Sequence, residues 1–435
     1  MIAHAKRLTK SKFARNVAIV ASGTAGAQAI TMAFSPIITR LYGPEAFGVL
    51  GTFTAILAVL TPLAALSYPI AIVLPKRDSD ALGLANLSLG IAVVMSLLAA
   101  MILTLFKAPI VNVFNLEAVE SFILLLPLAM LFTAAMAVMS QWVIRKKLFK
   151  IKAKVAVLQA LWLNLAKAGI GLLSPLSAVL VVLATAGSLI HALMLWVWVR
   201  KRTNSLIIKC DVKSLLLGNR YVDLAGRYRD FAYYRTPQNV LNAVSQSIPI
   251  LMLASFFGPA AAGFYALSKM VLGVPTELVG KSISSVFYPR FNEAVQNKEN
   301  HFELLIKVTL SLALVGLLPF SLLIVFGPWI FSALFGSEWH VAGEYAQWMA
   351  IWAYFGFLNS PSVSAIQVLS LNKFFLLYEV FSVAGRASFM AIGCIVFESD
   401  FTAVALFSIS AALFNALLVV IVMIACKKNQ MEGLI

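Results

Sequence analysis

Cysteine, histidine and acidic side chains are scarce in this chain of 435 residues. Its three cysteines and four histidines are scattered, so the sequence has neither a disulfide framework nor the ligand spacing of a metal site. Only 12% of the residues are charged, about half the share found in an ordinary soluble domain. We therefore expect no metal, no cofactor and no soluble catalytic domain.

Apolar residues are abundant instead: they make up 61% of the chain, and its mean hydropathy is +0.91. A helix that crosses a membrane takes roughly 20 residues, so a dozen such helices would absorb nearly all of them. The composition predicts an all-α polytopic membrane protein, and apolar runs separated by charges or by Pro and Gly predict twelve transmembrane helices. The approximate limits of these spans are 16–39, 47–74, 81–106, 121–144, 155–173, 176–199, 231–257, 261–287, 304–335, 345–370, 374–397 and 401–425.

Basic residues outnumber acidic ones by 34 to 18. With the N-terminus in the cytoplasm, 27 of the 34 fall in cytoplasmic segments, and only Arg40 and Lys107 fall in outer ones. This asymmetry follows the positive-inside rule, so it predicts two cytoplasmic termini and no nucleic-acid partner. The basic residues before position 16 precede a run that is too long for a signal peptide and lacks a clear cleavage site, which predicts an uncleaved first span.

The chain is expected to divide into two lobes of six spans. The predicted parts are a basic cytoplasmic N-terminus (1–15), an N-lobe (16–199), a cytoplasmic loop (200–230), a C-lobe (231–425) and a cytoplasmic tail (426–435). The window 43–63 matches 258–278 at eight of 21 positions, including the Gly-Pro pair that opens each window. Such a repeat predicts lobes related by a pseudo-two-fold axis along the membrane normal, as in secondary transporters with a central site. The alternative, a Gly-Pro turn between two helices, does not explain the shared offset.

Ionisable residues inside a predicted span are costly, which makes them candidates for function. The basic ones are Lys167, Arg235, Lys269, Lys281 and Arg386, with Arg40 at the outer end of the first span. The acidic ones are only Glu277 and Glu379. A surplus of cations repels a cationic drug and favours a diphosphate or an acidic sugar.

The acidic residues have a second interpretation. Glu277 lies four residues before Lys281, and Glu379 lies seven before Arg386, so each pair shares a helix face. Both acids are candidates for binding a coupling ion, but simple ion pairing with Lys281 and Arg386 explains them equally well. Arg235 and Lys281, near the cytoplasmic ends of their spans, could instead snorkel to the interface.

A polar stripe follows one face of the predicted seventh span, because Gln238, Asn242 and Gln246 step by four residues. Such side chains could hydrogen-bond sugar hydroxyls. They could also bond neighbouring helices, as polar residues in membrane spans often do.

The segment Ser35–Gly48, SPIITRLYGPEAFG, resembles the first-loop signature of the Wzx-type polysaccharide exporters. These are lipid-linked oligosaccharide flippases of the superfamily that includes the multidrug and toxin extrusion proteins. The segments Gly258–Tyr265 and Tyr288–Phe291 are similar to motifs in the family's second half. The other fold with two six-span halves, the major facilitator type, usually has a Gly-x-x-x-Asp-Arg loop after span two, and residues 76–80 read KRDSD here.

The resemblance implies a flippase that moves a polyprenyl-diphosphate-linked oligosaccharide (undecaprenyl type) to the periplasmic leaflet of the bacterial inner membrane by alternating access. The product would serve O-antigen of lipopolysaccharide, capsule or exopolysaccharide. The implied partners are membrane lipids, a coupling proton or sodium ion, and a polysaccharide polymerase with its chain-length machinery. In this mechanism the basic residues and the polar stripe bind substrate: Arg235, Lys269, Lys281, Arg386, Lys167, Arg40, Gln238, Asn242 and Gln246. Glu277 and Glu379 are the candidates for ion coupling.

Two other functions fit the same architecture. One is a drug or metabolite cation antiporter of the same fold, and the other is an assembly partner that recruits glycan-synthesis enzymes through the basic 200–230 loop. An enzyme is not expected, because the outer loops are too short for a glycosyltransferase or polymerase site. The sequence also has no Gly-rich loop that would bind ATP phosphates.

Overall fold

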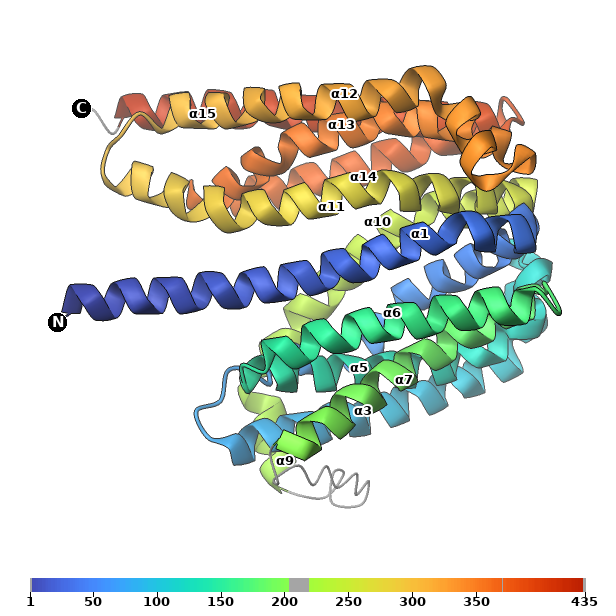
Figure 1. Cartoon of the computed structure of the whole chain (residues 1–435), viewed down its shortest axis with the longest axis horizontal. Helices are drawn as coiled ribbons and strands as arrows, with labels where there is room; N and C mark the ends of the chain where they lie inside the picture. The colour runs from blue at the N-terminus through green and yellow to red at the C-terminus, as the bar shows by residue number, and fades with distance from the viewer. Residues whose placement is uncertain (1, 203–218, 370, 433–435) are drawn as a thin grey trace. The chain divides into compact units, whose positions relative to one another are not determined.

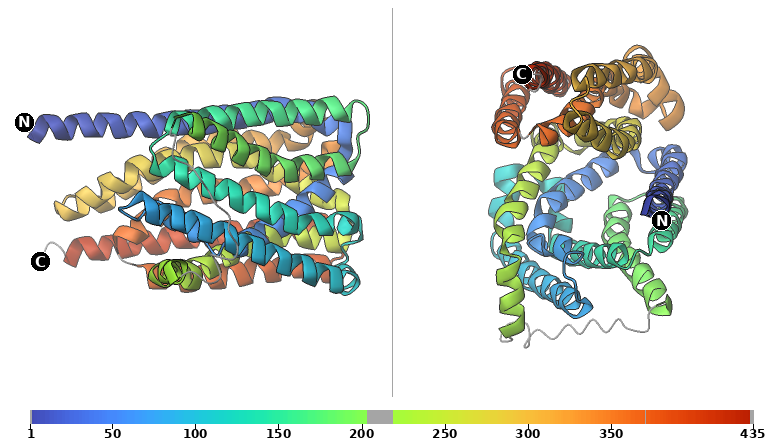
Figure 2. Two further views of the ribbon diagram at one scale, coloured as in Figure 1. Left: turned by 90° about the horizontal axis from the view of Figure 1, so that it is seen from below. Right: turned by 90° about the vertical axis from the view of Figure 1, so that its left-hand side faces the viewer.

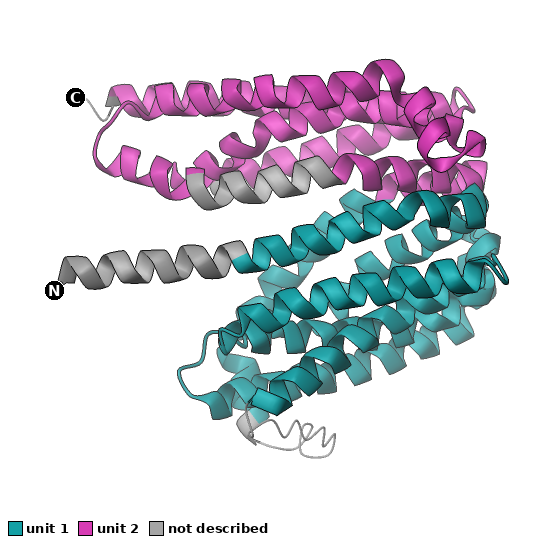
Figure 3. Ribbon diagram, in the orientation of Figure 1, with its two compact units in different colours: residues 1–247 teal, residues 248–435 magenta. Residues whose placement is uncertain are grey.

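The computed structural model describes the backbone of residues 2–202, 219–369 and 371–432, and the side chains of 19–202, 221–273, 287–369, 371 and 373–431. The described residues form helices joined by short turns (Figure 1), which confirms the all-α class. The chain divides into two compact units, Met1–Ser247 and Ile248–Ile435 (Figure 3).

Long helices fill unit 1, and shorter ones connect them. The helices of this unit are α1 (Ile2–Ala64), α2 (Tyr68–Ala71), α3 (Asp78–Leu105), α4 (Lys107–Phe114), the 3₁₀-helix η1 (Glu117–Leu125), α5 (Leu126–Arg145), α6 (Phe149–Gly171), α7 (Ser177–Arg202), α9 (Asn219–Arg227) and the π-helical turn η2 (Phe231–Arg235). Helix α10 (Thr236–Phe257) begins in unit 1 and continues into unit 2.

Helix α1 is two helices joined at Gly43. That residue has φ 67° and ψ 174°, a conformation that essentially only glycine adopts, and Pro44 follows it. The first part of α1 packs along α6 (Figure 2). At the joint, the Tyr42 hydroxyl donates to the Lys167 carbonyl of α6 over 2.8 Å. The chain therefore turns at Gly43 while the side chain before it is fixed to α6.

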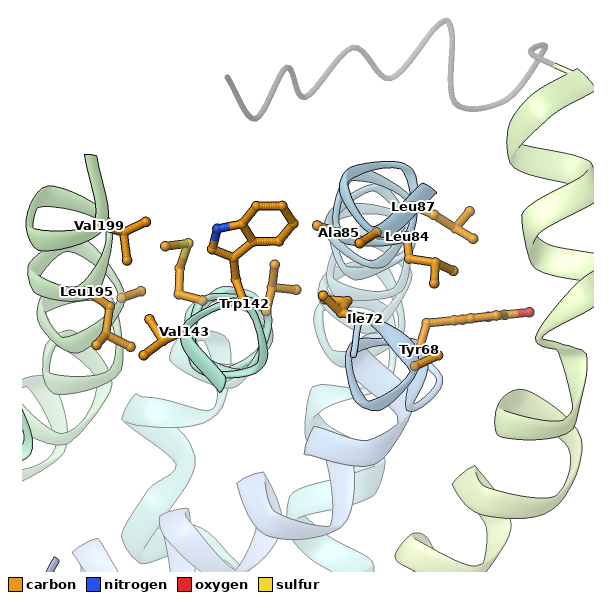
Figure 4. Packing of buried hydrophobic residues seen from close by; sticks show 14 of the residues in the cluster. Tyr68, Ile72, Leu84, Ala85, Leu87, Trp142, Val143, Leu195 and Val199 are labelled. Atoms are coloured by element: carbon orange, nitrogen blue, oxygen red, sulfur yellow. The ribbon is translucent and has the colours of Figure 1, made fainter. Parts of the chain in front are cut away.

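The core of unit 1 brings together side chains from α3, α5 and α7. Trp142 and Val143 of α5 lie between Leu195 of α7 on one side and Leu84 of α3 on the other (Figure 4). Trp142 is 2% exposed and Leu195 is fully buried. Close van der Waals packing among these side chains holds the three helices together at one end.

Unit 2 is built around one central helix. Its helices are α11 (Pro259–Gln296), α12 (His301–Phe335), η3 (Ser337–Trp339), α13 (His340–Val368), α14 (Asn372–Ile395) and α15 (Asp400–Glu432). Helix α13 packs against α11, α12 and α15, and α14 packs against α15. Helices α12 and α13 touch through glycine: a Cβ on Gly343 would lie 2.4 Å from the Cα of Pro328, so no larger residue fits there.

Among the described residues, eight helical segments are long and apolar enough to cross a membrane. They are Ile19–Ala64, Asp78–Leu105, Glu117–Arg145, Ser177–Arg202, Phe231–Phe257, His301–Phe335, Lys373–Ile395 and Asp400–Met431. The first of these covers the two spans predicted at 16–39 and 47–74. The spans predicted at 155–173, 261–287 and 345–370 coincide with α6, α11 and α13, which are not among the eight. The chain is a multi-pass membrane protein.

The predicted span 47–74 ends earlier than expected. Its helix stops at Ala64, because Leu66 (φ 46°) and Ser67 (φ 57°) adopt left-handed conformations before α2 begins. The Ser67 hydroxyl accepts hydrogen bonds from Thr236 (3.1 Å) and Asn239 (3.2 Å) of α10. These long-range bonds stabilise a break that apolar periodicity does not reveal.

Candidate functional site

Two charged residues of α14 form an ion pair within unit 2. Arg386 Nη2 lies 3.1 Å from Glu379 Oε1, and Arg386 Nε donates to the Ser382 carbonyl over 3.1 Å. The side chain of Arg386 is 11% exposed and that of Glu379 is 41% exposed. The two residues therefore share a helix face, as their spacing predicts, and the cation is the more deeply buried partner.

A buried tyrosine and a second cation belong to the same unit. Tyr265 of α11 is 1% exposed. Lys269 lies one turn further along α11 and is half-buried. Tyr378, next to Glu379 on α14, donates its hydroxyl to the Phe414 carbonyl over 2.5 Å, which anchors α14 to α15. Unit 2 thus places Lys269 and Arg386 on two different helices.

The polar stripe of α10 is exposed and begins at a cation. Arg235 Nη1 donates to Gln238 Oε1 over 2.8 Å, so these two predicted site residues are in direct contact. Asn242 and Gln246 follow at one-turn intervals, and all four side chains are exposed.

Other side chains of α10 bond to the rest of unit 1. Asn239 donates to Ser67, and the Ser247 hydroxyl donates to the Ala55 carbonyl over 3.1 Å. The Ser67, Thr236 and Asn239 network was not predicted, although Asn239 belongs to the same polar run as Gln238. Because these bonds fix α10 to the rest of unit 1, the stripe is held in place.

Arg40 and Lys167 lie near the same end of unit 1. Arg40 is exposed and precedes the Gly43 turn by three residues, and the backbone of Lys167 accepts the bond from Tyr42. Lys167 is half-buried and lies four residues before the end of α6. These two cations are therefore grouped by the turn at Gly43, while Arg235 and Gln238 lie at the start of α10.

Two predicted site residues remain without a structural account. Glu277 and Lys281 lie on α11, but their side chains are outside the described residues. Their proposed ion pair and coupling role stay predictions.

The cytoplasmic side predicted for unit 1 contains a clamp that sequence inspection did not identify. Arg145 at the end of α5 donates to Asp78 Oδ1 (3.0 and 3.1 Å) and to the carbonyls of Ile72 (3.2 Å) and Pro75 (2.7 Å). Lys146 Nζ lies 2.5 Å from Asp78 Oδ2. These hydrogen bonds, from Lys146 first and then Arg145, lower the pKa of the Asp78 carboxyl below its usual value. In the sequence, this clamp is indicated by the acidic residues of the segment 76–80 and the basic residues of the segment 145–154.

A pocket of about 480 Å³ adjoins this clamp. One wall is α9, which docks through Leu224 (2% exposed) and through the bond from the Tyr68 hydroxyl to the Ala225 carbonyl (3.1 Å). The pocket is lined by Leu74, Pro75, Lys76, Arg77, Asp80, Asp223, Leu224, Arg227 and Tyr228. Its lining carries charges of both signs, so it does not favour an anion or a cation by charge alone.

In the described part of the chain, no group of three or more His, Cys, Asp or Glu side chains could hold a metal ion.

Comparison with known proteins identifies a family. A family model described as polysaccharide biosynthesis protein matches residues 37–344, well over half of the chain. The succinoglycan biosynthesis transport protein ExoT of Rhizobium meliloti (strain 1021) is 21% identical over 332 residues. That alignment includes 74% of this chain and 61% of ExoT, so it leaves more than a third of ExoT without a counterpart.

Solved structures show the same fold. The chain is similar to an inward-facing multidrug resistance MATE family transporter of the MOP superfamily, with a TM-score of 0.72 and 13% identity over 93% of this chain and 95% of that one. It is equally similar to the lipid II flippase MurJ in its inward closed conformation, with a TM-score of 0.73 and 11% identity over 95% of this chain and 90% of that one. At these identities the likeness establishes the fold and leaves the cargo open.

Proposed function

This chain belongs to the polysaccharide biosynthesis protein family and has the fold of the MOP superfamily, and we propose that it flips a lipid-linked oligosaccharide across the bacterial inner membrane. Family and fold together identify a transporter, as the sequence predicts, and not an enzyme. The proposed cargo is a polyprenyl diphosphate that carries one glycan repeat unit, which moves from the cytoplasmic to the periplasmic leaflet.

The observation that carries the proposal is the sign of the charge in the apolar helices. Lys269 and Arg386 are partly buried in unit 2, and the side chain of Arg386 is less exposed than that of Glu379. Lys269 lies roughly 16 Å along α11 from Gly258, about half the thickness of a hydrocarbon core. A diphosphate is the part of the proposed cargo that requires such cations, because arginine binds phosphate oxygens in a bidentate manner and lysine adds a point charge.

The α10 stripe supports recognition of the glycan. Arg235 lies at its start, and Gln238, Asn242 and Gln246 extend from it along the helix with exposed amide groups. Amides both donate and accept hydrogen bonds, which suits sugar hydroxyls. We assign the stripe to the sugar and the cations to the diphosphate.

The remaining cations fit a path through the membrane. In the proposed arrangement twelve spans form two lobes with both termini in the cytoplasm, and the turns at Gly43 and Gly258 face the periplasm. Arg40 and Lys167, which lie near Gly43, would then contact the diphosphate after the lobes have opened to the periplasm. Lys281, towards the other end of α11, would meet it before.

Ion coupling is assigned to the acids. Glu379 forms an ion pair with Arg386. In an antiport cycle, the carboxylate of Glu379 would bind a proton or sodium ion from the periplasmic side after the cargo has left Arg386. Glu277 is the second acid on the proposed path. The polymerase and its chain-length machinery would receive the exported unit, for O-antigen, capsule or exopolysaccharide.

The test is a leaflet assay in a strain that lacks this protein and any second flippase. We expect complete polyprenyl-diphosphate repeat units to accumulate facing the cytoplasm and surface polymer to be lost. Re-expression of the wild type should restore both, whereas Lys269→Gln and Arg386→Gln should flip roughly tenfold more slowly, since a hydrogen bond to a charged group is worth about 1.5–3 kcal/mol. The control is Lys307→Gln, which removes an exposed cation paired with Glu303 on α12.

Two outcomes would contradict the proposal. Normal lipid-linked pools together with loss of resistance to cationic compounds would favour a drug or metabolite antiporter. Loss of function on deletion of residues 200–230, with full activity of both cation variants, would favour an assembly partner. Full transport by Glu379→Gln and Glu277→Gln, with unchanged dependence on the proton-motive force, would remove the coupling assignment alone.

A further inference from the structure

Nine basic residues are concentrated at the predicted cytoplasmic ends of α5, α6 and α7. The segments 145–154 and 200–202 contain them without any acidic residue: Arg145, Lys146, Lys147, Lys150, Lys152, Lys154, Arg200, Lys201 and Arg202. Arg145 and Lys146 are committed to Asp78. The proposed transport path uses none of these nine. The positive-inside rule explains on which side of the membrane they lie, but not the contacts that some of them make with tryptophan rings.

Three tryptophans lie beneath these cations. The Lys154 ammonium is 4.5 Å from the ring centroid of Trp198, although the two residues belong to different helices, α6 and α7. Arg200 lies 5.2 Å from Trp196, and Lys146 lies 5.4 Å from Trp142. Trp196 and Trp198 are half-buried, and both pack against the unit 1 core. Their rings are therefore held by the fold, and the cations above them are pre-positioned.

The Lys154 and Trp198 pair is the centre of a larger exposed surface. Lys150 lies one turn before Lys154 on α6, and Arg202 lies one turn after Trp198 on α7, and all three cations are exposed. The half-buried Met194 lies one turn before Trp198 on the same face of α7, and the exposed apolar residues Leu193 (49%) and Val197 (39%) lie beside that face. The surface thus changes from apolar to aromatic to cationic along the helix axis.

We propose that the surface formed by Lys150, Lys154, Trp198 and Arg202 binds the headgroup of an anionic glycerophospholipid of the cytoplasmic leaflet. Tryptophan is favoured at the level of lipid headgroups because its ring is apolar and its N–H is polar. The cations attract the headgroup phosphate, and the apolar residues below them contact the acyl chains. The order of these groups along α7 matches the order of groups in a phospholipid, which a nucleic acid or an acidic protein does not share. The site is independent of the cargo.

The experiment measures binding of phosphatidylglycerol and phosphatidylcholine to the purified full chain in detergent. The variant Lys150→Gln/Lys154→Gln/Arg202→Gln should lose at least about tenfold in affinity for phosphatidylglycerol, because each cation near an anionic headgroup contributes roughly fivefold. Binding of phosphatidylcholine should not change. The matched control, Lys298→Gln/Lys307→Gln/Lys373→Gln, removes three exposed cations from unit 2 and should stay within about twofold of the wild type.

A second measurement uses the variant Trp198→Phe, which removes the indole ring and leaves the three cations in place. Brominated phosphatidylglycerol should quench the tryptophan fluorescence of the wild type more than that of Trp198→Phe, and brominated phosphatidylcholine should not distinguish them. Equal losses in the two triple variants, or equal quenching with and without Trp198, would overturn the proposal. Displacement of phosphatidylglycerol from this surface by a short-chain polyprenyl diphosphate would overturn it too, since the site would then belong to the cargo.

Discussion

Arg145 shows how one side chain organises a turn between two membrane helices. Its guanidinium is 10% exposed and satisfies two backbone carbonyls and the carboxylate of Asp78. The turn between α2 and α3 has few regular backbone bonds of its own, so these side-chain bonds define its conformation. Lys146 adds a second cation to the same carboxylate and stacks on Trp142, which links the turn to the core of unit 1.

The clamp makes stability depend on pH in a defined direction. Hydrogen bonds from Lys146 and Arg145 lower the pKa of Asp78 below its usual 3.8. A lowered pKa stabilises the fold above the usual value, and that contribution is lost as the pH falls through the lowered one. We expect Asp78→Asn to cost up to about 1 kcal/mol at pH 7, as exposed ion pairs do, and less at an acid pH at which the Asp78 carboxyl of the wild type is protonated. Thermal unfolding in detergent at both pH values measures this difference.

A matched control for the clamp is Asp223→Asn. Asp223 pairs only locally with Arg227, one turn further on α9, and both side chains are more than half exposed. Its substitution should shift the unfolding temperature less than Asp78→Asn does. An equal shift for both variants would show that the clamp adds nothing beyond an ordinary surface pair.

At the scale of elements, the repeat is visible in the backbone itself. Gly43 has φ 67° and ψ 174°, and Gly258 has φ 84° and ψ −179°. Each glycine is followed by proline, which has no N–H and suits the first position of the helix that begins there. The same sharp turn therefore occurs at two positions 215 residues apart, as the repeat in the sequence predicts. The Gly-Pro pair recurs at both positions because both turns require a backbone conformation that glycine adopts.

Replacing Gly258 tests this conformational requirement. A Cβ at Gly258 would meet no atom within 4 Å, so Gly258→Ala changes backbone strain without a steric clash. We expect a loss of roughly 1–3 kcal/mol, the cost of holding a non-glycine residue in that conformation. The control is Gly273→Ala on the same helix, which also has open space and should be neutral or slightly stabilising, because alanine favours helices. Chemical or thermal unfolding in detergent compares them, and equal effects would refute the requirement.

At the scale of the whole molecule, membrane orientation is the property on which every mechanistic assignment depends. Eight helical segments of the described chain meet the length and hydropathy of a span. The proposed count of twelve divides the first segment at Gly43 and adds α6, α11 and α13. The asymmetry of 27 basic residues inside against two outside depends on that count, since one missing span would invert every loop after it.

Cysteine labelling in intact cells checks the orientation. In a cysteine-free background, single cysteines at the exposed positions Glu117, Glu338 and Glu398 should react with a membrane-impermeant maleimide. Cysteines at the exposed positions Lys147 and Lys298 should react only after the inner membrane is permeabilised. If the labelling pattern were inverted from one helix onwards, the number of spans would be wrong at that helix. Such a result would also remove the assignment of Arg40 and Lys167 to the periplasmic side.

The sequence alone determined the membrane class, the helical fold, the family resemblance and the surplus of cations in the predicted spans, because each depends on composition, on apolar run length or on short local motifs. The rotation of each helix was decided only by tertiary structure. Gln238 and Asn239 are adjacent, yet one contacts Arg235 on an exposed face while the other bonds to Ser67 inside unit 1. A span that is apolar on nearly all sides has no strong pattern that fixes which face turns inward. Long-range contacts such as those of Ser67 and Arg145 make that choice.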